Sequence, residues 1–289
     1  MAHSVAHARY TRAAVRKHAP PPFVTARQTV LGAVATGQEG VSAPVGVFLR
    51  TQGPKTVGRG QSWSHMSDQY ERSTDVPTVV IPYRNRDAHL KCLMARLAHV
   101  DVIVVEQADG HPFNRGALLN VGYNKARESG AQRVLLHDCD LLPDDTLLKM
   151  YCDPWPRPVV HFGALFNRYN NSGRYFGGVH GFTAGHYPGY PNHFWGWGGE
   201  DDALRNRVNP ETVTYPRRGV YLDLEGFVRP ADKLRTLTAR EKCNNRYELL
   251  ALDDARHDSH RVSTLHTTER WEIKSERVLW GCITLHREA

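Results

Sequence analysis

Residues 77–86 read PTVVIPYRNR, a β-branched run that ends in a polar loop with two arginines. A run of this kind is typical of a buried strand. The pattern repeats, because strand-like runs at 100–107 (VDVIVVEQ) and 133–140 (RVLLHDCD) follow helix-like stretches at 87–100 and 113–130. Strands and helices that alternate at these lengths predict an α/β fold with a mainly parallel central sheet.

The two helix-like stretches carry recognisable helix signals. Asn114 is a candidate N-cap for the second helix, and Gly130 is a candidate stop. In the first helix, apolar residues recur at the spacing of one face: Leu90, Leu93, Met94 and Leu97. The carboxyl-terminal stretch 271–287 (WEIKSERVLWGCITLHR) is again strand-like.

Composition and charge limit the class of protein. The chain has 289 residues, 40% of them hydrophobic, and a formal net charge of +7, which suits phosphate-bearing ligands. Residues 1–38 contain no acidic residue but five basic ones, and 1–75 are rich in Gly, Pro, Ser, Gln and His. We therefore expect a loosely structured basic extension at 1–75 and a folded domain at 76–289. A nucleic-acid contact or a transit-like peptide are the alternatives for the basic segment, but no nucleic-acid reader motif accompanies it, so no nucleic-acid partner is expected.

Membrane and disulfide signals are weak. No stretch approaches the ~20 apolar residues of a membrane span. The five cysteines show no CxxC spacing, which argues against a zinc ribbon and against a dense disulfide framework. The sequence does not predict an oligomeric state.

Charged side chains gather at the predicted ends of the first and third strands. Ligands of open α/β sheets bind beyond the carboxyl ends of the strands, and both PYRNR and DCD fall there. Asp138 and Asp140 form a D-x-D pair, which suits Mn²⁺ or Mg²⁺ carrying a diphosphate. Their side chains diverge unless the backbone bends. The alternative is a pair of turn or capping aspartates.

Three arginines support a diphosphate ligand at this edge. Arg84 and Arg86 follow the first strand, and Arg115 lies at the start of the second helix. Arginine forks match phosphate oxygens, and the N-terminus of a helix favours anions. Taken alone, each of the three is more typical of a surface residue, but their shared position beside predicted strand ends favours a diphosphate.

The stretch 193–207 (HFWGWGGEDDALRNR) is the most informative one for a sugar site. Trp195 and Trp197 stand among glycines, and an indole face can support the C–H surface of a sugar. The following carboxylates, Glu200, Asp201 and Asp202, can bind hydroxyl groups or accept a proton. The alternative is a core tryptophan pair before an acidic helix N-terminus, and both descriptions can hold together.

The ordered blocks VVIPYRNRDAHL, FNRGALLNVGY, HDCDLLP, RYFGGV and FWGWGGEDD resemble the β-1,4-galactosyltransferase family (glycosyltransferase family 7). The resemblance runs from about Pro77 to Arg207 and continues more weakly to the end of the chain. It implies a GT-A, Rossmann-like fold and inverting transfer of galactose from UDP-galactose to a hydroxyl of a glycan or glycoconjugate acceptor, with Mn²⁺, or alternatively Mg²⁺, as cofactor.

The resemblance also assigns roles to individual residues. Positions that match donor contacts in the family are Pro82, Tyr83, Arg84, Arg86, Phe113, Arg115, Asp138, Tyr175, Gly178 and Trp197. Asp140 matches the metal-ligating aspartate, and Asp201 matches the general base. Trp197, Glu200, Asp201 and Asp202 match the acceptor side, and Trp197 matches a tryptophan that moves with a closing loop. Tyr175 matches the position where tyrosine goes with galactose, whereas a smaller aliphatic residue goes with N-acetylgalactosamine.

The chain departs from the family pattern at the rest of the metal site. The family's Met-x-x-His or His-x-His is replaced by VYLDLEGF at 220–227. Asp223 and Glu225 have a spacing that could supply hard oxygen ligands instead, while an exposed acidic turn is the alternative. His257 and His260 are rival candidates to complete the site.

Two further departures concern the compartment. Cys152 falls at one half of a family disulfide, but the expected partner position near Arg133 holds no cysteine. The membrane anchor of the animal enzymes is also not found, so the Golgi lumen that the resemblance implies and a cytoplasmic location are both expected possibilities.

The sequence leaves three functional hypotheses. The first is galactose transfer, with a cleft shared by Asp140 and Asp201 as its condition. The second is transfer of a different UDP-sugar by the same fold. The third is an inactive protein that binds a sugar or a nucleotide sugar, motivated by the altered metal site. The acceptor sugar is not determined by the sequence.

Overall fold

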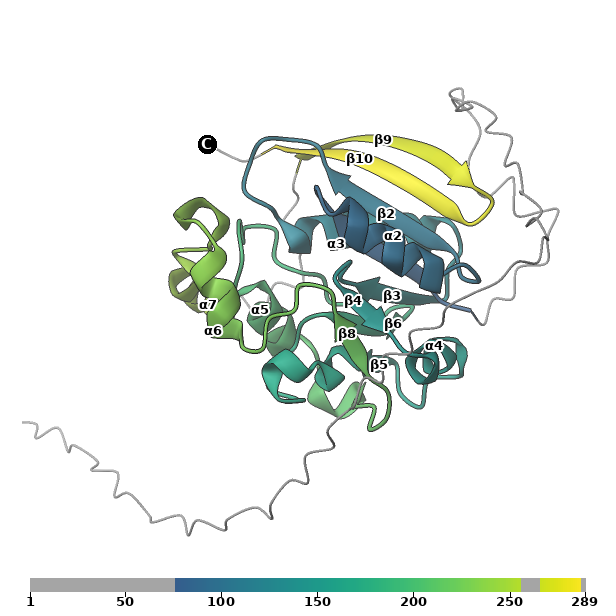
Figure 1. The fold of residues 1–289 in the computed structure, drawn as a ribbon. Coiled ribbons are helices and arrows are strands. Elements are labelled where there is room, and N and C mark those ends of the chain that lie inside the picture. Colours follow the sequence, from purple (N-terminus) through teal and green to yellow (C-terminus); the bar gives the residue numbers. More distant parts are fainter. Residues whose placement is uncertain (1–75, 256–265, 287–289) are drawn as a thin grey trace, which may run out of the picture. The chain divides into compact units, whose positions relative to one another are not determined.

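The computed structural model describes residues 76–255 and 266–286, and the fold below is that of these residues. The predicted extension at 1–75 lies outside them, as do His257 and His260. The first strands and helices are β1 (Thr78–Tyr83), α2 (Asp87–Arg96), β2 (Val102–Gln107), α3 (Arg115–Glu128) and β3 (Arg133–His137) (Figure 1). They confirm the alternation predicted from the sequence. Asn114 caps α3, since its side chain accepts a hydrogen bond from the Ala117 amide.

The middle of the chain is less regular. It contains β4 (Leu141–Pro143), α4 (Asp145–Cys152), β5 (Val159–His161), β6 (Val179–Thr183), α5 (Glu200–Arg207), β7 (Val213–Thr214) and β8 (Tyr221–Asp223). Four 3₁₀ turns lie at Phe162–Leu165, Asn167–Tyr169, Pro210–Thr212 and Ala239–Glu241. Then follow α6 (Pro230–Thr236), α7 (Arg246–Ala255), β9 (His266–Ser275) and β10 (Val278–His286).

The main sheet of the described chain has eight strands in the order β7-β5-β6-β3-β1-β2-β10-β9. Its centre is parallel, because β3, β1, β2 and β10 run in one direction. Strand β6 pairs antiparallel with β3 and β5, and β9 forms an antiparallel hairpin with β10. The carboxyl-terminal stretch thus extends the sheet, as its strand-like sequence predicted (Figure 1).

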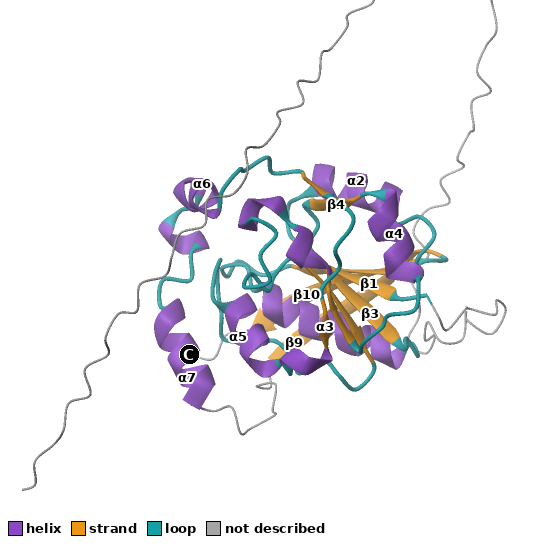
Figure 2. Cartoon of the chain, turned by 90° about the horizontal axis from the view of Figure 1, so that it is seen from below, coloured by secondary structure: helices purple, strands orange, loops and turns teal. Residues whose placement is uncertain are grey.

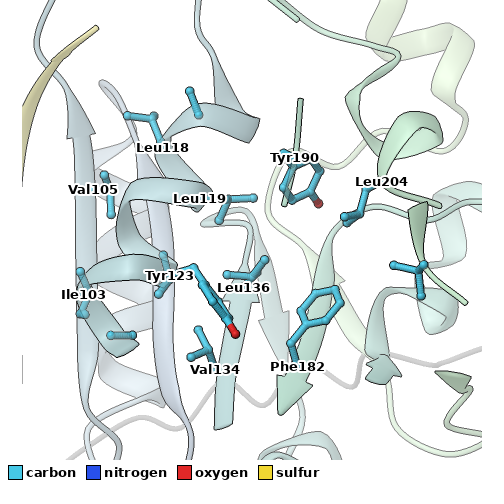
Figure 3. Close-up of a cluster of buried hydrophobic side chains, with 14 of the residues drawn as sticks. Ile103, Val105, Leu118, Leu119, Tyr123, Val134, Leu136, Phe182, Tyr190 and Leu204 are labelled. Atoms are coloured by element: carbon cyan, nitrogen blue, oxygen red, sulfur yellow. The ribbon is translucent and has the colours of Figure 1, made fainter. Parts of the chain in front are cut away.

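Helices cover both faces of this sheet (Figure 2). Alternate residues of the central strands point to opposite sides, so Val80 and Val105 pack with α3 while Val79 and Val104 pack in the cluster of α2 and α4. Figure 3 shows Leu118, Leu119 and Tyr123 of α3 above the first of these faces. Removing this apolar surface from water is the main stabilising contribution to the fold.

Helix α3 lies very close to the sheet at Gly122. A Cβ atom at this position would stand 2.2 Å from Cγ1 of Val80 and 2.7 Å from Cγ2 of Val105. Only glycine allows this approach without a shift of the helix. The approach fixes the depth of α3, whose amino-terminal residue is Arg115.

A small second sheet brings distant acidic residues together. Strand β4 pairs with β8 so that Leu141 stands opposite Asp223. The Leu224 amide donates to the Asp140 carbonyl at 2.8 Å. Asp223 is therefore fixed beside the D-x-D stretch, although more than 80 residues separate them in the sequence. Among the described residues, no helix is both long and apolar enough to cross a membrane.

Candidate active site

One cleft of about 920 Å³ collects most of the predicted site residues. The predicted residues along its lining are Pro82, Arg84, Arg86, Phe113, Arg115, Asp138, Asp140, Tyr175, Trp197, Glu200, Asp201 and Asp202. Asp140 and Asp201 thus share a cleft, which was the condition for a common glycosyl donor. The size fits a ligand of nucleotide-sugar dimensions.

Four other predicted residues, Tyr83, Gly178, Asp223 and Glu225, do not line the cleft. Tyr83 donates to Asp87 at 2.7 Å and packs edge-on against Trp280. The carbonyl of Gly178 accepts the Asp138 amide at 3.2 Å, and Gly178 has a φ of +78°, which favours glycine. Asp223 and Glu225 join the site through their ion pairs, described below.

Arg115 connects the two halves of the cleft. Its Nε lies 2.6 Å from Asp138, and its Nη1 lies 2.8 Å from Asp201. The hydroxyl of Tyr190 also accepts from Nη1 at 3.0 Å. Burial opposes the charge of this guanidinium, but the carboxylates around it, Asp138 first, raise the pKa of Arg115 well above its ordinary value. The guanidinium of Arg115 thus forms ion pairs with two carboxylates, Asp138 and Asp201. Its contact with a diphosphate stays a prediction.

Glu200 and Asp201, at the start of α5, lie in an environment that favours the neutral forms of their carboxyl groups. Burial raises the pKa of Asp201 well above its usual range; Arg115 opposes this, while Glu200 and Asp138 add to it. Burial likewise raises the pKa of Glu200. A carboxylate whose pKa is raised is a stronger base, which is the property expected of a proton acceptor near neutral pH.

An aromatic pair forms one wall beside Asp201. Tyr175 and Tyr169 stack with ring centroids 3.6 Å apart and an interplanar angle of 4°. Both line the cleft. Tyr169 lies on a short 3₁₀ turn. The sequence did not indicate it, because its stacking on Tyr175 depends on the tertiary arrangement of the two segments.

Trp197 lies in a glycine-rich loop whose backbone is fixed by a distant segment. Its amide donates to the Glu241 carbonyl at 2.7 Å, and its carbonyl accepts from the Cys243 amide at 3.1 Å. The flanking Gly196 and Gly198 have φ values of +91° and +111°, which side chains rarely adopt. The glycines of the GWGG motif therefore have a backbone function besides any contact with a ligand.

Asp138 and Asp140 point to different partners, as their alternate spacing predicted. Asp138 pairs with Arg115, whereas Asp140 lies with Asp223 and Glu225. One oxygen from each of these last three residues lies within 4.8 Å of the other two. A set of hard oxygen ligands at such spacing fits Mn²⁺ or Mg²⁺, so the residues present are compatible with the metal that the sequence predicts.

Three cationic side chains already accompany this carboxylate trio, and two of them, Arg168 and Lys233, are buried. Arg168 binds Asp223 at 2.6 Å and Glu225 at 3.0 Å, and Arg86 binds Glu225 at 2.8 Å. The ammonium of Lys233 donates to both oxygens of Glu225. The predicted exposed acidic turn is thus not found, since the side chain of Glu225 is only 4% exposed. Arg168 and Lys233 carried no signal in the sequence.

The surroundings shift the pKa values of two members of the trio in opposite directions. Burial, together with Asp138 and Glu225, raises the pKa of Asp140 to about 7, while Lys233 and Arg168 lower it. Burial also acts to raise the pKa of Glu225, but the hydrogen bonds from Lys233 and Arg86 outweigh it and bring that pKa to about 2. Glu225 is therefore ionised at neutral pH, and Asp140 is the member whose charge depends most on a nearby cation.

Comparison with protein-family models supports the resemblance to glycosyltransferase family 7 that the sequence motifs carry. The model described as the N-terminal region of glycosyl transferase group 7 matches residues 55–153, and the model described as the N-terminal domain of galactosyltransferase matches residues 157–228. Human β-1,4-galactosyltransferase 3 is 37% identical over 145 residues, and rat β-1,4-galactosyltransferase 6 is 40% identical over 146. Each alignment covers 45% of this chain, and 36% and 37% of those relatives. The match thus spans little more than a third of the relatives' length.

Comparison with solved structures supports the fold. The catalytic domain of Drosophila β-1,4-galactosyltransferase 7, in complex with xylobiose, gives a TM-score of 0.54 at 23% identity and covers 73% of this chain and 94% of that one. A mutant of the same enzyme in complex with manganese, UDP-Gal and xylobiose gives the same TM-score at 22% identity, with the same shares of the two chains. The GT-A fold predicted from the sequence is confirmed.

Proposed function

Because the chain belongs to glycosyl transferase group 7, we propose that it is an inverting glycosyltransferase that moves galactose from UDP-galactose to a hydroxyl group of a sugar acceptor. The observation that carries the proposal is the single cleft that contains both Asp140 and Asp201. The first suits a cation and diphosphate, and the second suits proton acceptance. The relatives named β-1,4-galactosyltransferases, and the neighbour solved with UDP-Gal and manganese, support UDP-galactose as the donor and Mn²⁺ as the metal.

The donor occupies the side of the cleft at the ends of β1 and β3. Arg84 donates to the His111 carbonyl at 2.7 Å and lies over the Phe113 ring at 5.2 Å, which leaves an aromatic and cationic surface for the nucleotide. Asp140, Asp223 and Glu225 would hold the Mn²⁺, which would supply positive charge to offset the negative charge of the departing diphosphate. The galactose then extends past Asp138 toward Tyr175.

Asp201 accepts the proton of the acceptor hydroxyl. Burial raises its pKa, and Arg115 both limits that rise and holds Oδ1 at 2.8 Å. Arg115 is thus a positioning residue, which lowers the pKa of Asp201 and orients its carboxyl group while the hydroxyl oxygen attacks the anomeric carbon. Trp197 and Glu200 form the acceptor side of the cleft, where an indole face and a carboxylate suit a sugar ring and its hydroxyls. Attack from this side and departure of UDP on the other invert the anomeric centre.

The conservative variant Asp201→Asn tests the general base. The substitution removes the proton acceptor and keeps the shape, so UDP release with a panel of monosaccharide acceptors should fall about 10²–10⁴-fold, the usual contribution of general base catalysis. Calorimetry should show that UDP-galactose still binds with Mn²⁺. Unchanged turnover in the variant would refute the role of Asp201. Binding without turnover in the wild-type protein, over the whole panel, would favour an inactive nucleotide-sugar-binding protein.

A further inference from the structure

Lys233 is a buried lysine whose position the proposed reaction leaves unexplained. It lies on α6, and its side chain is 8% exposed although lysine is seldom buried unless it is paired. Its ammonium group donates to both oxygens of Glu225 and also borders the cleft. The ammonium therefore occupies both oxygens of one of the three carboxylates assigned to the metal.

The carboxylate trio is electrically balanced by side chains alone. Asp140, Asp223 and Glu225 carry three negative charges when ionised, and Arg86, Arg168 and Lys233 carry three positive ones. A divalent cation added to this cluster would leave two excess positive charges in a largely buried place, which is costly. Metal binding is less costly if one of the three side-chain cations withdraws.

Lys233 is better able to withdraw than Arg168. Arg168 is held by a fork on Asp223, with contacts of 2.9 and 2.7 Å, and by the rings of Phe166 and Phe227 at 4.9 and 5.3 Å. Lysine is a point charge on a flexible stem and keeps no comparable planar geometry. Lys233 also comes from α6, a helix of seven residues that follows the trio in the sequence.

We propose that the ammonium group of Lys233 and the divalent cation are alternative partners of the Glu225 carboxylate. Without metal, Lys233 is the resident cation of the site, and it supports a nucleoside diphosphate bound there. When metal enters, Lys233 leaves Glu225, and the departing charge offsets part of the incoming one. This inference rests on the proposed function, since it assumes that a diphosphate and a metal use the cleft.

The first test measures Mn²⁺ binding to the full chain by calorimetry. Lys233→Met removes the competing cation, so Mn²⁺ should bind about tenfold more tightly or better, the change expected from loss of one charge-assisted hydrogen bond. Lys149→Met is the matched control, because Lys149 lies on α4, is 74% exposed and pairs with Asp153 just beyond that helix. The Mn²⁺ affinity of this variant should not change. Equal or weaker Mn²⁺ binding by Lys233→Met would overturn the inference.

The second test measures UDP binding in EDTA. The wild-type chain should bind UDP without metal, and Lys233→Met should bind it about tenfold more weakly. Excess Mn²⁺ should remove most of this difference. UDP binding in EDTA that is absent from the wild-type chain, or unaffected by the substitution, would contradict a resident cation.

A third measurement uses the wild-type chain and does not depend on the folding of a variant. Lysine acetylation followed by mass spectrometry should label Lys233 slowly in EDTA and faster at saturating Mn²⁺, while the labelling of Lys149 stays constant. Unchanged labelling of Lys233, at Mn²⁺ levels where calorimetry shows binding, would overturn the exchange. If turnover from UDP-galactose is present in that case, only this inference fails; if no UDP-sugar binds or turns over, the proposed function fails as well.

Discussion

The substitution Arg115→Met tests whether the guanidinium between Asp138 and Asp201 organises the cleft. Methionine keeps much of the apolar stem and removes the charge. Removal of one partner of a buried ion pair costs about 3–5 kcal/mol. The two carboxylates keep 23% and 24% of their side-chain surface exposed, so water compensates part of the loss and we expect about 2–3 kcal/mol. Urea denaturation at pH 7.5 measures this change in the free energy of unfolding.

The same substitution should change two pH dependences. Arg115 lowers the pKa of Asp201 against the effect of burial, so its removal raises that pKa further. Asp201 must be ionised to accept a proton, and the acidic limb of the kcat/KM profile should therefore move to higher pH. A carboxyl whose pKa is raised by folding stabilises the fold in its protonated form. The stability cost of Arg115→Met should consequently shrink as the pH falls and the carboxyl groups become neutral.

Matched variants separate this effect from a general loss of charge. Arg235 is 70% exposed and pairs with Asp232, so Arg235→Met should change stability by less than about 0.5 kcal/mol. In a double-mutant cycle, Arg115→Met and Asp201→Asn should show a coupling of about 1 kcal/mol or more. An Arg115→Met protein with wild-type stability and an unshifted acidic limb would refute the positioning role of Arg115.

Two other predictions concern the core and the donor. Gly122→Ala places a methyl group against Val80 and Val105, and this overpacking should reduce the free energy of unfolding by about 1–3 kcal/mol. The comparison variant is Gly130→Ala, where a Cβ meets no atom within 4 Å but the positive φ adds backbone strain. Thermal unfolding of the two variants side by side tests whether steric contact or backbone conformation costs more stability. Tyr175→Leu removes a ring that stacks on Tyr169 and opens space beside the donor sugar, so the ratio of UDP-N-acetylgalactosamine to UDP-galactose turnover should rise at least about tenfold. An unchanged ratio in competition assays with both donors would show that Tyr175 does not select the sugar.

Local patterns were sufficient to predict the elements that carry the site. The β-branched runs that became β1, β2 and β3 need no distant partner to be recognised, because burial of both faces demands apolar side chains along the whole strand. The cap at Asn114 follows from the side chain's own hydrogen bond to the backbone. The positions of Asp138 and Asp140 at the end of β3 follow from the direction of the parallel strands. Motif order then indicated the family, since each block lies where a strand or helix ends.

The partners of the charged residues could not be predicted in this way. Arg86, Arg115 and Arg168 are similar side chains in the sequence, yet their partners differ. Arg86 pairs with Glu225, Arg115 with Asp138 and Asp201, and Arg168 with Asp223 and Glu225. These pairs join segments that are 23–139 residues apart. Coulomb energy depends on distance and burial, and both quantities exist only once the chain has folded.

The sequence by itself therefore determined the parallel α/β core, the family and the kinds of side chain at the rim of the sheet. Only the tertiary structure decided that Arg115 pairs with Asp138 and Asp201 and that Lys233 pairs with Glu225. The physical reason is that hydrophobic periodicity is a property of neighbouring residues along the chain, whereas the charge state of a buried group is a property of everything that surrounds it in space.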